Sequence, residues 1–321
     1  MVGAYRYSRT TGIGFKYAEF SSTRVREDLK ENHGREISRS LVQDIAAVVA
    51  AVALVKEGDW SYRLPKLESP PTTVAIGLDG ACLLLGEDGW RETMVGTISL
   101  YDHEGERQHT IYLGATPEYG KATFLERLEA EVDRVKATYP EAHYVGITDG
   151  AEGNWGVLEK HTGVQVTDFW HAAEYLGKAA VVLYRGRPRA RQAWLDEVCH
   201  WLKHEGEGAE AVLKQLKSLA KRRPWAKGDE DVKRAITYFT NQSKAGRMDY
   251  AARVAAQEPT GSGATEAACK VLVKQRLRGS GMKWKEGGAA AVLSLRCLSY
   301  TPERWSQFWS KIDRWGFPVA A

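Results

Sequence analysis

Three aspartates stand directly after short apolar runs that are rich in β-branched residues. These runs are Thr72–Asp79 (TTVAIGLD), His143–Asp149 (HYVGITD) and Val164–Asp168 (VQVTD). Such runs predict strands, and the nearly continuous first run is typical of a strand buried on both faces. Parallel strands hold their polar working groups at their carboxyl ends, so each acid is either a turn former or a metal ligand at a rigid edge. For any one aspartate alone, both interpretations stay open.

A further acid, Glu266, lies in the first turn of a predicted helix over Ala264–Leu277. The helix dipole favours a carboxylate at this position, so capping is the alternative to a role in a site. Lys270 and Lys274 follow one and two turns further along the same helix. A basic helix face beside an acid is what a site for a phosphate backbone requires.

Together, Asp79, Asp149 and Glu266 predict phosphoryl-transfer chemistry. If the strands before the two aspartates are neighbours, their carboxylates lie side by side and repel each other. A pair of Mg²⁺ (or Mn²⁺) ions relieves this repulsion, because Mg²⁺ takes hard oxygen ligands and keeps positions for water and phosphate oxygens. Two such ions, about 3.5–4 Å apart, activate the nucleophile and stabilise the leaving oxygen of an in-line displacement. We therefore expect these three acids to bind metal and to act in DNA cleavage or strand transfer.

The sequence DFWH places Asp168 and His171 at the end of the third run and the start of the next helix. We expect this pair to orient the site, with His171 close to the scissile phosphate. The alternative is a local helix cap by Asp168 and a packed histidine. Trp170, between them, either stacks on an unpaired base or packs in the core.

Basic residues are concentrated in three clusters, although the formal net charge is only +4. Such clusters indicate a surface for a polyanion, here double-stranded DNA, although solvated helix faces would give the same pattern. We expect the first cluster, with Lys270 and Lys274, to contact the DNA backbone. The clusters are Arg185, Arg187, Arg189 and Arg191; Lys221, Arg222 and Arg223; and Lys270, Lys274, Arg276, Arg278, Lys283 and Lys285.

The elements that must position these residues predict an α/β fold. The expected order is a strand ending at Asp79, a hairpin over Arg91–Tyr101 and Arg107–Ala115, a helix over Thr123–Tyr139, and the strand–helix–strand unit His143–Thr167. This order predicts a mixed sheet with helices on its faces. Arg191–Ala256 lacks strand signals and has apolar stripes at helical spacing, which predicts an all-helical insertion.

The remaining segments predict five regions along the chain. Ser22–Trp60 has helical spacing, with a weak likeness to a helix-turn-helix around Gly34. The first twenty residues show no clear period, which predicts a loose segment. Leu64–Pro71 holds three prolines and reads as a linker. We expect an N-terminal helical region, a core in two parts around the insertion, and a C-terminal helical tail, with boundaries at 1–66, 67–185, 186–257, 258–290 and 291–321.

Composition predicts a soluble protein of the cytoplasm, and the expected action on DNA associates it with the nucleoid. The 321 residues are 43% hydrophobic and 27% charged, without an apolar run of the roughly 20 residues that a membrane span needs and without a secretory leader. The four cysteines form no CxxC pair, which argues against a zinc ribbon and a disulfide framework. Cys199, His200 and His204 have loosely metal-like spacing but no second cysteine pair.

In combination, these motifs resemble bacterial insertion-sequence transposases of the ISKra4 type, from about Gly34 to Pro318. The resemblance is carried by TVAIGLDGACLLL, RETMVGTISLYD, GERQHTIYLGATPEYGKATFL, YVGITDGAEGNW, DFWHAAEYL and GSGATEAACKVLVKQRLRGSGMKW. It implies an RNase H-like core with a D-D-E triad at Asp79, Asp149 and Glu266, and at least a homodimer in the active complex. The D-x-x-H of Asp168 and His171 is similar to a motif of the hAT and Mutator-like transposases.

Other function classes remain as alternatives. A metal-dependent nuclease on the same fold would cleave DNA without strand transfer. Members of the resembled group usually carry more DNA-binding sequence at the N-terminus, so a truncated copy that only binds DNA is a second alternative. A nucleotide-binding enzyme is disfavoured, because neither a glycine-rich phosphate loop nor a P-loop lysine follows any predicted strand.

Overall fold

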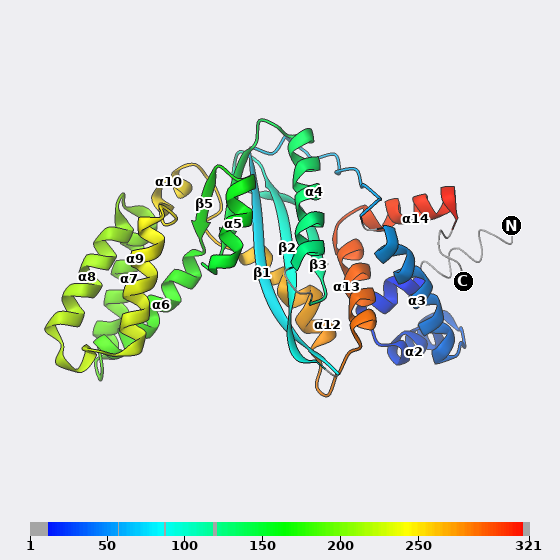
Figure 1. Cartoon of the computed structure of the whole chain (residues 1–321), viewed down its shortest axis with the longest axis horizontal. Helices are drawn as coiled ribbons and strands as arrows, with labels where there is room; N and C mark the ends of the chain where they lie inside the picture. The colour runs from blue at the N-terminus through cyan, green and yellow to red at the C-terminus, as the bar shows by residue number, and fades with distance from the viewer. Residues whose placement is uncertain (1–11, 57, 87, 118–120, 317–321) are drawn as a thin grey trace.

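A mixed five-stranded sheet forms the centre of the molecule, with the strand order β3-β2-β1-β4-β5 (Figure 1). The computed structural model describes residues 12–56, 58–86, 88–117 and 121–316. β1 pairs antiparallel with β2 and parallel with β4, β2 pairs antiparallel with β3, and β4 pairs parallel with β5. The predicted α/β class and mixed sheet are confirmed. The strands are β1 Thr73–Leu85, β2 Gly89–Tyr101, β3 Arg107–Ala115, β4 His143–Thr148 and β5 Val164–Thr167.

The first strand is longer than its sequence predicts. β1 continues six residues past Asp79, to Leu85, because β2 pairs with it along its whole length. The parallel neighbour β4 ends at Thr148, and the register pairs Gly77 with Ile147. The prediction that Asp79 ends the strand is therefore wrong. Asp79 instead lies in β1 beside the point where β4 ends.

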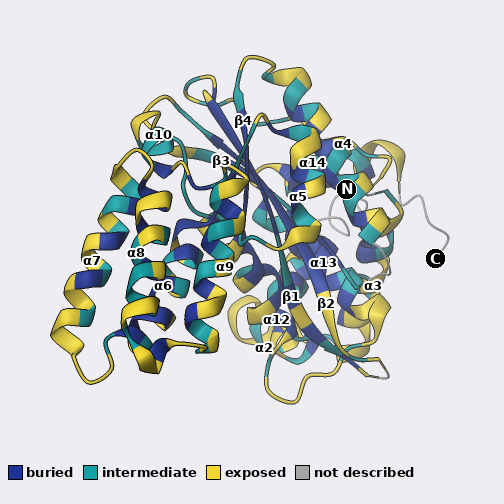
Figure 2. Cartoon of the chain, turned by 60° about the vertical axis from the view of Figure 1, so that its left-hand side comes forward, coloured by how far each residue is buried: buried dark blue, intermediate teal, exposed yellow. Residues whose placement is uncertain are grey.

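Both faces of the sheet are covered by helices, so its strands are largely buried (Figure 2). On one face, α4 (Ala122–Thr138) and α5 (Glu152–His161) bury Phe124, Leu128 and Trp155 against the even-numbered side chains of β1. The other face is covered by α6 (Phe169–Leu183), by α13 (Glu286–Tyr300), and by the continuous helical stretch α11 (Gly263–Ala268), η3 (Cys269–Lys274) and α12 (Gln275–Leu277). Since side chains alternate along a strand, Asp79 shares this second face with Ala81 and Leu83.

The helices at the two ends of the described chain share a core with each other. Residues 12–19 are helical, so the absence of a period at the N-terminus did not mean a loose segment; residues 1–11 lie outside the described residues. α2 (Ser22–His33) and α3 (Arg39–Lys56) are joined through Gly34, and α3 packs against α13 and α14 (Arg304–Trp315). Residues 61–72 form no helix or strand, as the linker interpretation predicts.

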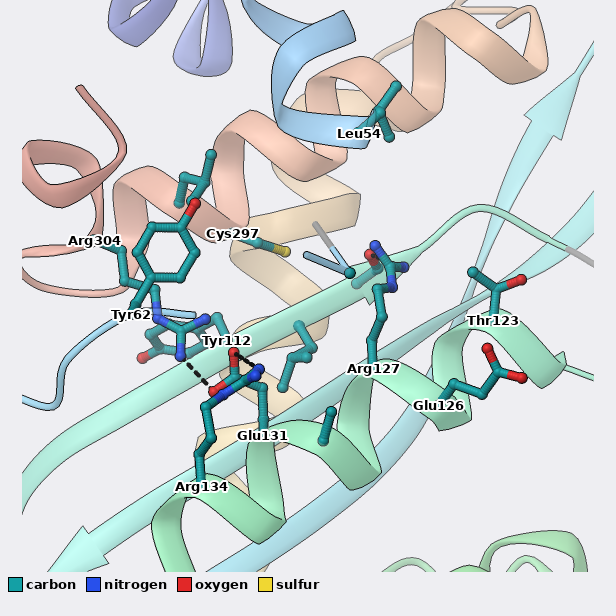
Figure 3. Close-up of a pocket in the computed structure, with 15 residues that line it drawn as sticks. Leu54, Tyr62, Tyr112, Thr123, Glu126, Arg127, Glu131, Arg134, Cys297 and Arg304 are labelled. Atoms are coloured by element: carbon teal, nitrogen blue, oxygen red, sulfur yellow. Dashed lines mark hydrogen bonds and ion pairs between the residues drawn. The ribbon is translucent and has the colours of Figure 1, made fainter. Parts of the chain in front are cut away.

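A buried ion-pair cluster ties α14 to α4 beside a cavity of about 320 Å³ (Figure 3). Arg304 contacts Glu131 at 2.7 Å, and Arg134 contacts the other oxygen of the same carboxylate at 3.0 Å. Burial raises the pKa of Glu131, but the two guanidinium groups outweigh burial, and the net pKa is lowered. This cluster fixes the C-terminal tail on the sheet layer.

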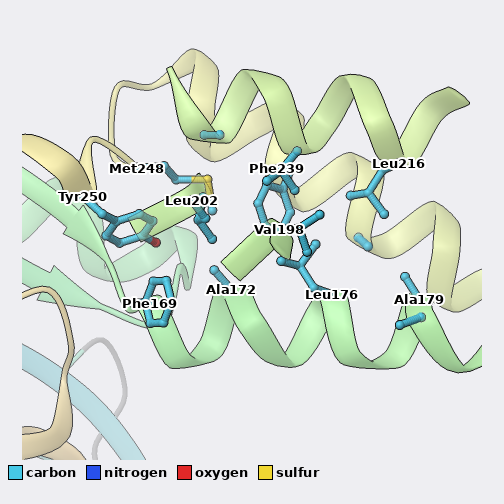
Figure 4. Packing of buried hydrophobic residues seen from close by; sticks show 14 of the residues in the cluster. Phe169, Ala172, Leu176, Ala179, Val198, Leu202, Leu216, Phe239, Met248 and Tyr250 are labelled. Carbon is cyan, nitrogen blue, oxygen red and sulfur yellow. The ribbon is translucent and has the colours of Figure 1, made fainter. Parts of the chain in front are cut away.

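The stretch from Pro188 to Ala255 is helical, as the sequence predicts for Arg191–Ala256, and it packs on α6 (Figure 4). Its core is continuous with the sheet: Phe169, Leu176 and Val198 belong to the same buried cluster as Val145 of β4. α6 therefore connects the edge of the sheet to the helical insertion, and it packs against both. The insertion elements are α7 Pro188–His204, α8 Gly208–Arg222, η2 Pro224–Ala226, α9 Glu230–Lys244 and α10 Tyr250–Ala255.

Candidate active site

The three predicted acids line one open pocket of about 930 Å³ at the carboxyl end of β4. Its walls come from β1, the turn after β4, the N-terminal half of α6, and the α11–η3 stretch. Segments that are far apart in the sequence therefore meet there. The lining side chains that can do chemistry are Asp79, Asp149, His171, Glu174, Ser262, Glu266, Lys270 and Lys274.

Asp79 lies partly buried in the pocket floor, and its pKa is raised. Burial is the largest cause, and the negative charge of Asp149 adds to it. The Gly80 amide donates to Asp79 Oδ1 at 2.7 Å, and this hydrogen bond, the Cys269 thiol and Lys274 act in the opposite direction. The net result is a carboxylate whose negative charge is under-compensated, which is the condition that a bound cation relieves.

Asp149 is held in a turn at the end of β4. Its Oδ1 accepts from the Ala151 amide at 3.0 Å, and its backbone carbonyl accepts from the Tyr238 hydroxyl at 2.9 Å. Gly150 has a φ of +105°, which a glycine adopts without strain. The turn-forming role foreseen for an aspartate here is real, and the same residue lines the pocket beside Asp79.

Glu266 reaches the pocket because α11 approaches the sheet closely at Gly77. A Cβ atom at position 77 would lie 2.0 Å from Thr265 Oγ1, so only glycine leaves room for this helix. The Thr265 hydroxyl forms a 2.7 Å hydrogen bond with that of Thr97 on β2. Thr265, one residue before Glu266, therefore fixes the start of α11 against β1 and β2.

Asp168 is fully buried and acts as a structural clamp, as the capping alternative foresaw. Its Oδ1 accepts from the His171 amide at 2.7 Å, which caps α6. Its Oδ2 accepts from the amide and the hydroxyl of Ser262, the latter at 2.7 Å. Asp168 does not line the pocket, but it joins the start of α6 to the loop that leads to Glu266.

Ser262 was not singled out by the sequence. Besides its contact with Asp168, its hydroxyl lies 3.2 Å from Glu266 Oε1. The spacing Ser262-x-x-x-Glu266 across a helix start could have indicated the contact between these two side chains. The contact with Asp168 could not be predicted in this way, because Asp168 is 94 residues away in the sequence. Glu174 was also missed: it follows His171 by one helical turn and is exposed at the pocket wall, with Lys178 at 3.7 Å.

His171 lines the pocket, and its ring stands edge-on to those of Tyr175 and Tyr238, with ring centroids 5.5 and 6.1 Å away. These tyrosines stack on each other at 4.1 Å, so the histidine ring rests on a rigid aromatic surface. Trp170 is 68% exposed, which shows that the core-packing alternative for it is wrong.

Of the predicted DNA contacts, Lys270 and Lys274 line the pocket, and both are exposed. They belong to the stretch whose hydrogen bonding becomes π-helical at Cys269–Lys274, a feature often found at functional sites. Arg185, Arg187, Arg189 and Arg191 lie instead beyond the other end of α6. Arg276, assigned by sequence to the third basic cluster, is not part of an exposed surface. Its side chain is buried and donates to the carbonyls of Tyr17 and Phe20.

The donor set at the pocket fits a hard divalent cation. Asp79, Asp149 and Glu266 offer carboxylate oxygens, and the ionised form of Asp79 is disfavoured by burial and by Asp149. Within the described residues, however, no three His, Cys, Asp or Glu side chains are already close enough to share one metal ion. That statement covers Cys199, His200 and His204 of the weak zinc pattern as well. Among the described helices, none is long and apolar enough to cross a membrane.

No protein-family model matches this chain, and no curated protein matches it.

Proposed function

We propose that this chain is a DDE transposase of the ISKra4 type, which cuts and transfers DNA strands on an RNase H-like core. One observation carries the proposal: carboxylates from β1, the end of β4 and the start of α11 line a single open pocket together with Lys270 and Lys274. The resemblance in sequence motifs places the same three acids, Asp79, Asp149 and Glu266, in the triad.

The proposed reaction is an in-line phosphoryl transfer in two steps. A water oxygen attacks the phosphorus at the end of the element, the P–O3′ bond breaks, and a 3′-hydroxyl and a 5′-phosphate result. That 3′-hydroxyl then attacks a phosphodiester of the target strand and displaces its 3′-oxygen. Two Mg²⁺ or Mn²⁺ ions bound by the acids would supply nucleophile activation and stabilise the leaving oxygen.

Each side chain has a defined part in this scheme. Asp79 and Asp149 on the sheet side of the pocket, and Glu266 on the helix side, are the residues that would hold the cations. Lys270 and Lys274 attract the phosphate backbone and offset the charge that develops on phosphate oxygens. His171 faces the reacting phosphate, Asp168 orients the site through Ser262, and exposed Trp170 stacks on a base freed at the cut end.

The partners follow from the chemistry. The substrate is double-stranded DNA, as element ends and as target, and joining two ends calls for a homodimer or larger assembly. Such an enzyme works in the cytoplasm at the nucleoid.

The test is cleavage of end-labelled duplex that carries the DNA flanking this coding sequence, with Mg²⁺, Mn²⁺ or EDTA. We expect metal-dependent nicking that leaves a 3′-hydroxyl. Asp79→Ala and Glu266→Ala should each lower the rate by a factor on the order of 10³ or more, because metal placement is lost. Glu197→Ala, which removes an exposed acid of α7, is the matched control and should cleave normally.

The products separate the proposal from its alternatives. Joined product containing target DNA supports strand transfer, whereas nicking alone indicates a nuclease. Duplex binding without cleavage in any metal would overturn the enzymatic proposal and leave a DNA-binding protein.

A further inference from the structure

Basic side chains from two segments of the chain converge at the far end of the helical insertion. One segment is the turn between α6 and α7 together with the first turn of α7, and the other is the end of α8. Arg223 connects them: its guanidinium lies 4.1 Å from the centre of the Tyr184 ring, and it donates to the carbonyl of Leu183. The exposed cations gathered there, which we call the basic tip, are Arg185, Arg187, Arg189, Lys221 and Arg222.

The charge of the basic tip is not neutralised within the described part of the chain, where none of its five cations forms an ion pair. Asp196 of α7, seven residues from Arg189, accepts a hydrogen bond from Gln192 at 2.8 Å. Two acids at the start of α9 are also engaged in other ways. Asp229 caps α9 by accepting from two amides, and Glu230 contacts Lys233 at 3.2 Å. Concentrated like charge without partners destabilises a folded protein unless a polyanion binds there.

An apolar platform adjoins the basic tip. Trp225 is 55% exposed, and its ring is fixed by a 3.2 Å hydrogen bond from Nε1 to the carbonyl of Val182. Val181 beside it is 54% exposed. A half-exposed tryptophan on the segment that follows Lys221 and Arg222 suits the sugar–phosphate surface of a nucleic acid, which has apolar sugar faces between its charges.

The helix α6 sets the distance between the basic tip and the pocket. His171 stands in its first turn, and the tip begins directly after its last residue, Leu183. Fifteen helical residues span about 22 Å, and successive base pairs of B-DNA rise about 3.4 Å. A duplex that runs along α6 would therefore reach the tip about six or seven base pairs from a phosphate in the pocket.

We propose that the basic tip is a second contact for duplex DNA, which grips the backbone about six base pairs from the phosphate in the pocket. The position of that phosphate rests on the proposed function, whereas binding of DNA by the tip does not. The tip would supply affinity without sequence preference, and it would align the duplex with α6.

The first experiment measures binding of a labelled 30-base-pair duplex over a range of salt concentrations. The variant Arg189→Ala/Arg222→Ala takes one exposed cation from each segment of the tip. We expect roughly tenfold weaker binding near 0.1 M salt and a salt slope shallower by about two, close to one for each lost phosphate contact. The control Arg63→Ala/Lys66→Ala removes two exposed cations from the linker and should bind like the wild type.

A second measurement, of duplex binding without cleavage, tests the tip proposal independently of the proposed function. Wild-type protein assayed in EDTA, where the proposed function predicts no cleavage, should still bind duplex, and this binding should remain sensitive to the tip substitutions. Tip-dependent binding in a protein that cleaves nothing would contradict the proposed function and leave the tip intact. If the tip variant bound duplex with the affinity and salt slope of the wild type, the tip proposal would be wrong. Binding of single-stranded RNA and of anionic phospholipid vesicles is measured in parallel. A variant that lost binding to either of these but kept duplex binding would also overturn the proposal.

Discussion

At the scale of single residues, Asp79 is the most informative position in the pocket. Its raised pKa, caused first by burial and also by Asp149, means that the ionised form is disfavoured in the fold. For a carboxyl with a raised pKa, this unfavourable contribution exists above the folded pKa and fades as the pH falls through it. At neutral pH, Asp79→Asn should therefore stabilise the metal-free protein, by only a small amount because the group is partly solvated.

The same substitution should remove the response to metal. A ligand that binds only the folded state raises its stability by mass action, so millimolar Mg²⁺ or Mn²⁺ should raise the wild-type Tm. Asp79→Asn should show a higher Tm without metal and little or no rise with it. Differential scanning fluorimetry with and without Mn²⁺ measures both effects, with Glu197→Ala as control. A metal-induced rise in Asp79→Asn equal to that of the wild type would contradict the role of Asp79 as a ligand.

Residue types and local spacing were enough to select the acids that meet in the pocket. Asp79 and Asp149 follow apolar runs, and Glu266 begins a helix with lysines on its exposed side. What the sequence could not show depends on long-range contact. The clamp by Asp168 became visible only because Ser262, 94 residues away, packs against it. Likewise, the burial of Arg276 depends on carbonyls of Tyr17 and Phe20, which no local pattern reveals.

At the scale of elements, the close packing of α11 on β1 places Glu266. Gly77→Ala would push a methyl group to within 2.0 Å of Thr265 Oγ1, and the helix must move away from the sheet. Overpacking of this kind costs about 1–3 kcal/mol, and a displaced Glu266 should reduce cleavage by a larger factor than the loss of stability explains. Chemical denaturation and cleavage rates, measured on the same preparation, give both quantities.

The neighbouring residues offer a rescue and a control for this prediction. Thr265→Ala in the Gly77→Ala background removes the clashing oxygen and should restore part of both stability and cleavage. Gly153→Ala places a methyl group where no atom lies within 4 Å, and it should be close to neutral. If Gly77→Ala behaved like Gly153→Ala, the packing at Gly77 would not be what positions Glu266.

The elements themselves followed from hydrophobic periodicity, with errors at their ends. β5 and the hairpin of β2 and β3 were predicted closely, because turn residues delimit them. The extension of β1 past Asp79 was not predicted. The sequence ACLLL does not show that β2 continues to pair with β1 there after β4 has ended. The π-helical stretch at Cys269–Lys274 was predicted only as helix, since the change in hydrogen bonding depends on packing against the sheet.

At the scale of the whole molecule, regions that look separate along the chain depend on each other. The N-terminal helices share a core with α13 and α14, and Arg304 of α14 is buried against Glu131 of α4. Near this cluster lies His109 of β3, which is buried and whose pKa is lowered to about 4, first by burial and then by Arg304. The attachment of the C-terminal tail is therefore coupled to the protonation of groups within the core.

This coupling predicts a loss of stability in mild acid. The unfolded chain protonates His109 below its ordinary pKa of 6.5, whereas the folded protein does so only below about 4. The unfolded state thus binds more protons between these values, and the free energy of unfolding falls as the pH drops from 6.5 to 4, by up to about 3 kcal/mol from this residue. His109→Gln should flatten that part of the pH profile, even if the variant is less stable at pH 7.5. Urea denaturation at several pH values measures the slope, and His103→Gln, on an exposed loop, should keep the wild-type slope. Equal slopes in the wild type and His109→Gln would show that the buried histidine does not govern the acid response.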